Sequence, residues 1–97
     1  MSIIRVSVED MERAAYRCRD LAARIEQCKE DCRALNEELQ AAWDGQTAQE
    51  FDSFVQTTAT RVLQECSEMC YNTAQAINHT CQQFTEADTT LSGTFSV

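Results

Sequence analysis

A heptad repeat of apolar residues, broken once near the middle of the chain, constrains the fold most. Before the break, apolar side chains recur at alternating steps of three and four residues, which is the spacing of one face of an α-helix. One position of the repeat holds Met11, Cys18, Ile25, Cys32 and Leu39, and the other holds Ala14, Leu21, Cys28, Leu35 and Ala42. The pattern predicts one long helix over about residues 8–43.

A second apolar stripe follows the break and advances by about 3.7 residues per step, which is again a helical period. Its members are Phe51, Val55, Thr58, Val62, Cys66, Met69, Thr73, Ile77, Cys81 and Phe84. The stripe predicts a second helix over about residues 48–91, and Ser92-Gly93 then marks a tail over 92–97. The threonines of Thr57-Thr58-Ala59-Thr60 are poor helix formers, so we expect a weakened helix there.

The break itself, Trp43-Asp44-Gly45-Gln46-Thr47, predicts a tight turn over residues 44–47. Gly45 is one of only two glycines and suits the left-handed conformation that ends a helix. Thr47 and Glu50 have the spacing of a capping box for the second helix, and Ser7 and Asp10 have it for the first. The fold class is therefore all-α, a single antiparallel helix-turn-helix hairpin.

A lone hairpin of this length does not bury apolar residues on more than one side, and here they are spread widely. Phe51, Phe54 and Val55 fan across more than one face of the second helix, while Ala15 and Ala22 widen the stripe of the first. Exposed apolar surface of this extent usually marks an interface. We expect the hairpin to dimerise into a four-helix bundle.

Charge and residue types argue against several function classes. The net charge is −8, whereas proteins that bind nucleic acid need a basic surface. The N-terminus has no apolar core of signal-peptide length, and no later run is long enough to span a membrane. His79 is the only histidine, and a bundle without pocket-forming loops offers no active site, so we expect neither an enzyme nor a cofactor.

Trp43-Asp44-Gly45, central in a chain of 97 residues and flanked by two long helices, resembles the WXG family of type VII secretion substrates. These are small helical hairpins related to the early secreted antigen and culture-filtrate proteins of mycobacteria. The resemblance implies a protein made in the cytoplasm and secreted as a folded homodimer, or as a heterodimer with a paralogous hairpin. Outside the cell it would act as an effector, a structural factor or a targeting partner.

A second resemblance lies near the C-terminus, where family members carry an aromatic residue followed by an acid four positions later. A wider form of the pattern continues with apolar residues three and seven positions after the acid. Phe84, Asp88, Leu91 and Phe95 fill it in order, with Phe where Tyr is commoner. The resemblance implies a tail signal that a secretion ATPase or channel component recognises.

Six cysteines, three on each predicted helix, set this chain apart. The pairs Cys18–Cys81, Cys28–Cys70 and Cys32–Cys66 have nearly the same sum of residue numbers, as the rungs of an antiparallel ladder do. This ladder of disulfides favours an oxidising destination, although it needs a longer connection between the helices or an overhang of the second helix by roughly 9 Å. A zinc site built from Cys28, Cys32, Cys66 and Cys70 is an alternative, which would make the chain a metal carrier or a chaperone. Reduced thiols packed in the core are a third possibility.

Overall fold

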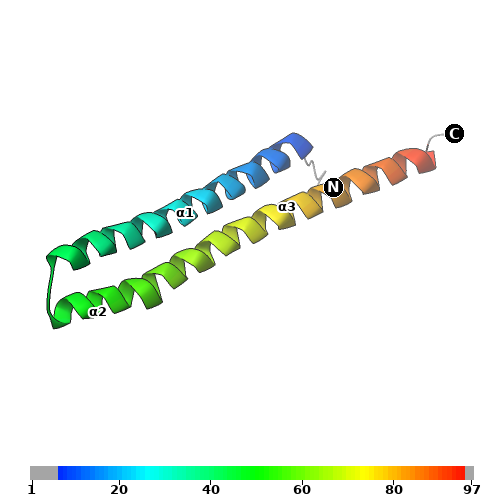
Figure 1. Ribbon diagram of the computed structural model, residues 1–97. Coiled ribbons are helices and arrows are strands. Elements are labelled where there is room, and N and C mark those ends of the chain that lie inside the picture. The colour runs from blue at the N-terminus through cyan, green and yellow to red at the C-terminus, as the bar shows by residue number, and fades with distance from the viewer. Residues whose placement is uncertain (1–6, 96–97) are drawn as a thin grey trace, which may run out of the picture.

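Two long helical rods lie side by side and run in opposite directions (Figure 1). The computed structural model describes the backbone of residues 7–95 and the side chains of residues 7–85. The first rod is α1 (Val8–Ala42). The second consists of α2 (Gln46–Phe54), a π-helical turn η1 (Val55–Ala59) and α3 (Thr60–Phe95). Residues 7–95 contain no strand, so the predicted all-α helical hairpin is confirmed.

The start of α1 follows the prediction. Ser7 is the N-cap, and its side-chain oxygen accepts a hydrogen bond of 3.2 Å from the backbone N–H of Asp10. Glu9 and Asp10 lie in the first turn, where negative charge interacts favourably with the helix dipole. The other end of the hairpin differs: α3 continues through Gly93 to Phe95 instead of ending near Leu91.

The predicted cap of the second helix is wrong. Thr47 lies inside α2, because that helix begins one residue earlier at Gln46, and its N-cap is Gly45, which has no side chain to donate or accept a bond. Gly45 therefore starts a helix and does not end one; α1 ends with Trp43 in an extended conformation. The φ of Gly45 is 114°, a region that other residues rarely adopt, while a Cβ there would meet nothing within 4 Å. Glycine is needed for its backbone conformation alone.

The contact between the rods is made by small and polar residues spaced seven apart. On α1 the buried positions are Ala15, Ala22 and Asn36, and the Lys29 side chain, seven residues from both Ala22 and Asn36, is only 11% exposed. On α3 the buried positions are Thr60, Ser67, Ala74 and Cys81. Ser67 Oγ donates a hydrogen bond of 3.2 Å to the Ala22 carbonyl, which fixes the register of the two rods.

The π-helical turn η1 keeps these buried positions in line. Ala48 and Val55 are buried seven residues apart, but the next buried position, Thr60, follows after only five. One π-helical turn spans this step, because its hydrogen bonds join residues five apart. In an uninterrupted α-helix Val62 would take the place of Thr60, and Val62 is 45% exposed. The weakened threonine segment is thus a π-turn, and Thr57 and Thr60 bond back to carbonyls four residues earlier.

The leucines of the heptad repeat are not buried against the second rod, although that repeat predicts the face of contact. Leu35 is 58% exposed, and Leu21 and Leu39 are exposed as well. Small side chains let two helix backbones approach closely, so they occupy the centre of the contact, and the larger side chains are pushed to one side. We call this side the apolar flank. Its members are Met11, Cys18, Leu21, Ile25, Cys28, Cys32, Leu35, Leu39, Phe51, Phe54, Leu63, Cys66, Cys70 and Ile77.

Candidate interaction surfaces and the turn motif

The turn motif carries an aromatic contact between the two rods. The rings of Trp43 and Phe51 have centroids 5.8 Å apart and an interplanar angle of 46°. Trp43 follows the last residue of α1 and Phe51 lies in α2, so this pair ties the end of one rod to the start of the other. Asp44 and Gly45 are exposed at the tip. The motif thus combines a fixed aromatic pair with an accessible acid.

A polar network that the apolar patterns of the sequence do not predict lies directly behind the turn. Asn36 Nδ2 donates a hydrogen bond of 2.7 Å to Asp52 Oδ1, and Gln40 Nε2 donates one of 2.9 Å to the Ala48 carbonyl. Gln40 also donates to Asn36 Oδ1, at 3.3 Å. Asn36 is 2% exposed, and buried amides of this kind must be fully bonded. Its place seven residues after Lys29, in the stripe that contains Ala15 and Ala22, was the signal available in the sequence.

We expect Asn36→Ala to destabilise the turn end of the hairpin by about 1–3 kcal/mol, because the partly buried Asp52 carboxylate loses its amide donor. Urea unfolding followed by circular dichroism measures this change. Glu37→Ala, at the exposed neighbouring position, is the matched control and should change stability by less than about 0.5 kcal/mol. Equal effects of the two variants would show that the network does not hold the turn.

The apolar flank deepens into a groove near the turn. The groove has a volume of about 400 Å³, and residues of both rods line it, among them Leu35, Leu39, Phe51 and Phe54. All four side chains are exposed in the single chain. A surface of this kind is suited to packing against another apolar surface, because each of these partly exposed leucines and phenylalanines gains roughly 1 kcal/mol when the rest of its side chain is buried.

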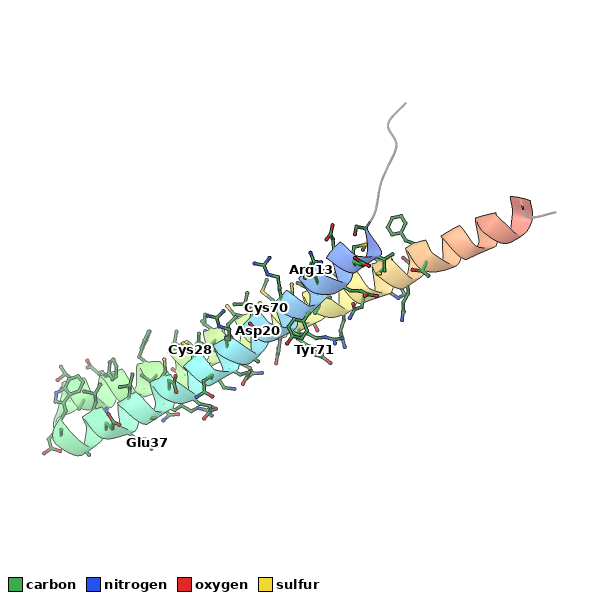
Figure 2. All side chains as sticks on the ribbon, turned by 90° about the horizontal axis from the view of Figure 1, so that it is seen from above. Arg13, Asp20, Cys28, Glu37, Cys70 and Tyr71 are labelled. Atoms are coloured by element: carbon green, nitrogen blue, oxygen red, sulfur yellow. The ribbon has the colours of Figure 1, made fainter. Side chains whose placement is uncertain are left out.

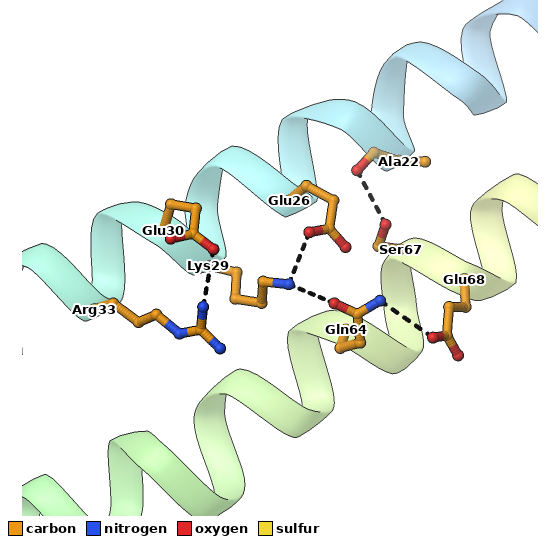
Figure 3. Close-up of polar contacts among 8 residues, drawn as sticks. All are labelled: Ala22, Glu26, Lys29, Glu30, Arg33, Gln64, Ser67 and Glu68. Carbon is orange, nitrogen blue, oxygen red and sulfur yellow. Dashed lines mark hydrogen bonds and ion pairs between the residues drawn. The ribbon is translucent and has the colours of Figure 1, made fainter.

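The opposite side of the hairpin is polar. Lys29 Nζ lies 2.8 Å from Glu26 Oε2 and donates a hydrogen bond to Gln64 Oε1, and Gln64 in turn donates to Glu68 at 3.1 Å (Figure 3). The hydrogen bond from Lys29 holds the pKa of the Glu26 carboxyl below its ordinary value. Arg19 and Tyr71 line an open cavity beside this cluster. We call this side the polar flank, and it is the one suited to remain in water.

Helical hairpins occur in unrelated proteins, and a match to a known family distinguishes between them. The family described as proteins of 100 residues with WXG, or WXG100, matches residues 3–89 of the chain. The chain belongs to the WXG100 family. This is the family of type VII secretion substrates; its members are secreted, non-enzymatic proteins that generally form dimers. Comparisons with curated proteins and with solved structures give no match.

The family motif of this WXG100 chain is the turn described above, whereas its tail pattern is described only in part. Phe84 lies on α3 and is exposed. Asp88, Leu91 and Phe95 lie in the same helix, but their side chains are outside the described part of the structure. The end of α3 projects beyond the start of α1, so no part of α1 covers the helix there (Figure 1). The tail signal stays a prediction.

The six cysteines of the WXG100 chain are all free thiols in this structure. Cys70 lies level with the stretch of α1 between Arg13 and Asp20, whereas Cys28 lies closer to the turn (Figure 2). A Cys28–Cys70 bond would therefore need one rod to slide by about two and a half helical turns, and the ladder stays a prediction that this register does not favour. Burial, with Cys28 close by, raises the pKa of the Cys32 thiol.

The described residues offer no support for a zinc site or for a membrane span. Within the described residues, no three side chains of His, Cys, Asp or Glu gather in a way that could hold a metal ion. The proposed zinc ligands Cys28, Cys32, Cys66 and Cys70 are thus not assembled within one chain. The described helices also include none that is long and apolar enough to cross a membrane.

Proposed function

We propose that this WXG100 protein is exported as a folded dimer by a type VII secretion system. The observation that carries the proposal is the apolar flank, which a single hairpin leaves exposed on one side along both rods. The partner is a second copy or a paralogous hairpin. Packing two such flanks against each other gives a four-helix bundle whose polar flanks face water.

The proposed recognition elements are the turn and the tail. Trp43, Asp44 and Gly45 present an aromatic pair and an acid at one end of the hairpin. Phe84, Asp88, Leu91 and Phe95 are spaced to share one face of α3, since residues three and four apart are neighbours on a helix. We infer that a secretion ATPase or channel component binds this tail. After export the protein acts outside the cell as an effector, a structural factor or a targeting partner.

Asp88→Ala is expected to reduce export by at least about tenfold, because the tail loses the acid that follows Phe84 on one face. The measurement is the ratio of secreted to cellular protein in a strain with an active type VII system. Glu86→Ala is the matched control: it removes the same charge two positions away, on another side of the helix, and should export normally.

Circular dichroism must show the same helical content for both variants. Normal export of Asp88→Ala would contradict a tail signal on the helix face that contains Phe84 and Asp88. An equal loss of export for Asp88→Ala and Glu86→Ala would contradict it as well. Trp43→Ala gives an independent check at the other end, because it removes the aromatic contact with Phe51 and leaves the tail intact.

A further inference from the structure

We propose that Cys18 and Cys70 form an intrachain disulfide when the protein is oxidised, in place of the predicted ladder. The proposal rests on the register of the two rods and not on the export route. Cys18 follows the buried Ala15 by three residues, and Cys70 follows the buried Ser67 by three. The two thiols thus stand in matching positions of the two heptad patterns.

The register places both thiols at nearly the same level. Ser67 lies opposite Ala22, because its hydroxyl bonds to the Ala22 carbonyl. Ala15, seven residues before Ala22, and Ala74, seven residues after Ser67, lie one step further from the turn and are buried in the same way. Counting from this contact, the residue opposite Cys18 is the one next to Cys70, an offset of about 1.5 Å along the axis.

Both thiols also lean to the same side of the contact. Consider, on each of two antiparallel helices, a residue at the centre of the contact. The residues three positions after it lie on one side of the contact on both helices, and the residues four positions after it lie on the other side. Arg19 and Tyr71 are the corresponding pair four positions on, and both line the cavity of the polar flank. Cys18 and Cys70 are half-buried on the apolar flank, between the layers Met11–Ile77 and Ile25–Leu63, which are half-buried as well.

The other cysteines have no level partner on the opposite rod. Cys81 lies near the start of α1, where that helix has no cysteine. Cys28 and Cys66 are offset by about 7 Å along the axis, and the ladder pairs Cys28–Cys70 and Cys32–Cys66 by more. Because Cα atoms of bonded cysteines are separated by no more than about 7 Å, an offset of this size along the axis leaves no room for separation across it.

The oxidation needs a disulfide-bearing oxidant such as oxidised glutathione. One thiolate attacks a sulfur of the oxidant and releases one thiol, and the second thiolate then displaces the other. The net change converts two protein thiols and one oxidant disulfide into one protein disulfide and two released thiols. Both sulfurs are free in this structure, and no cysteine pair of the described residues lies at disulfide distance. Forming the bond therefore requires a local shift of the two rods, whose contact at this level consists of the small residues Ala15, Ser67 and Ala74.

The test treats the full-length protein, without denaturant, with oxidised glutathione and then blocks the remaining thiols. Cleavage after glutamates separates Cys18, Cys28, Cys32 and Cys66 onto four peptides and leaves Cys70 with Cys81 on residues 69–86. We expect the Cys18 peptide to be linked to 69–86, in the wild type and in Cys81→Ser, but not in Cys70→Ser. The oxidised protein should melt roughly 10 °C above the protein in dithiothreitol.

Cys28→Ser is the matched control, because it removes a thiol of α1 that has no level partner; the Cys18–Cys70 link and the melting shift should both persist. Links of Cys28 to 69–86 and of Cys32 to the Cys66 peptide would restore the ladder and overturn the proposal. Glutathione adducts or interchain bonds as the main products would overturn it too. None of these outcomes depends on export, which is tested separately through Asp88.

Discussion

Leu35→Glu is expected to raise the dissociation constant of a homodimer at least about 100-fold. Leu35 is more than half exposed in the hairpin and lines the groove of the apolar flank near the turn, so a partner that packs on this flank buries it. Each protomer loses roughly 1–2 kcal/mol of apolar burial, because about half of the Leu35 side chain is still open to a partner, and it places a carboxylate in the interface; every 1.4 kcal/mol is a factor of ten. Sedimentation over a range of protein concentrations measures the change.

Tyr16→Glu is the matched control for this prediction. Tyr16 is 72% exposed and directly follows Ala15, which places it on the side of the polar flank. Its replacement removes a large side chain and adds the same charge, yet dimerisation should be unchanged. A dimer that survives Leu35→Glu but dissociates with Tyr16→Glu would mean that the hairpins pair through the polar flank.

Inserting one alanine after Leu63 is expected to destabilise the hairpin by at least roughly 3 kcal/mol, whereas deleting Thr57 should change stability by less than about 1 kcal/mol. The insertion turns Ser67, Ala74 and Cys81 by about 100° away from α1, because an α-helix advances by that angle per residue. The deletion removes the extra residue of η1 and leaves the same buried positions in line, with regular α-helix in its place.

Thermal and urea unfolding of the two variants provide the comparison, with the unaltered protein as reference. The measurement is informative because both variants change the chain length by one residue. If the deletion proved as damaging as the insertion, η1 would not be the single extra residue that keeps the two heptad patterns in phase.

The periodicity of the sequence was enough to predict two helices and a turn near Gly45, because both signals are local. It was not enough to predict which face of each helix meets the other. Hydrophobicity favoured the stripe of Leu21, Leu35 and Leu39, but close approach of two backbones favours Ala15 and Ala22. When a chain has a second interface to form, the most apolar stripe need not be the one used within the hairpin.

The candidate site was predictable to a similar degree. The turn motif was found from the three letters Trp43-Asp44-Gly45, but its support by Asn36 and Asp52 was not, since that contact joins residues on two rods. The helix cap at Thr47 was wrong because Gly45 already supplies the backbone conformation that starts α2. The cysteine ladder was predicted from equal sums of residue numbers, and these sums assume a register of the two helices. No local sequence pattern determines that register.

The extents of the hairpin, 78 × 21 × 18 Å, matter for any passage through an opening. A hairpin of this shape has to align its long axis with the opening before it can enter. Its leading end is then either the turn that contains Trp43 or the opposite end of the hairpin. No bulky loop between residues 7 and 95 widens the silhouette. Pairing two hairpins along their length roughly doubles one of the two narrow dimensions and leaves the other almost unchanged. A transporter could therefore accept the dimer without unfolding it.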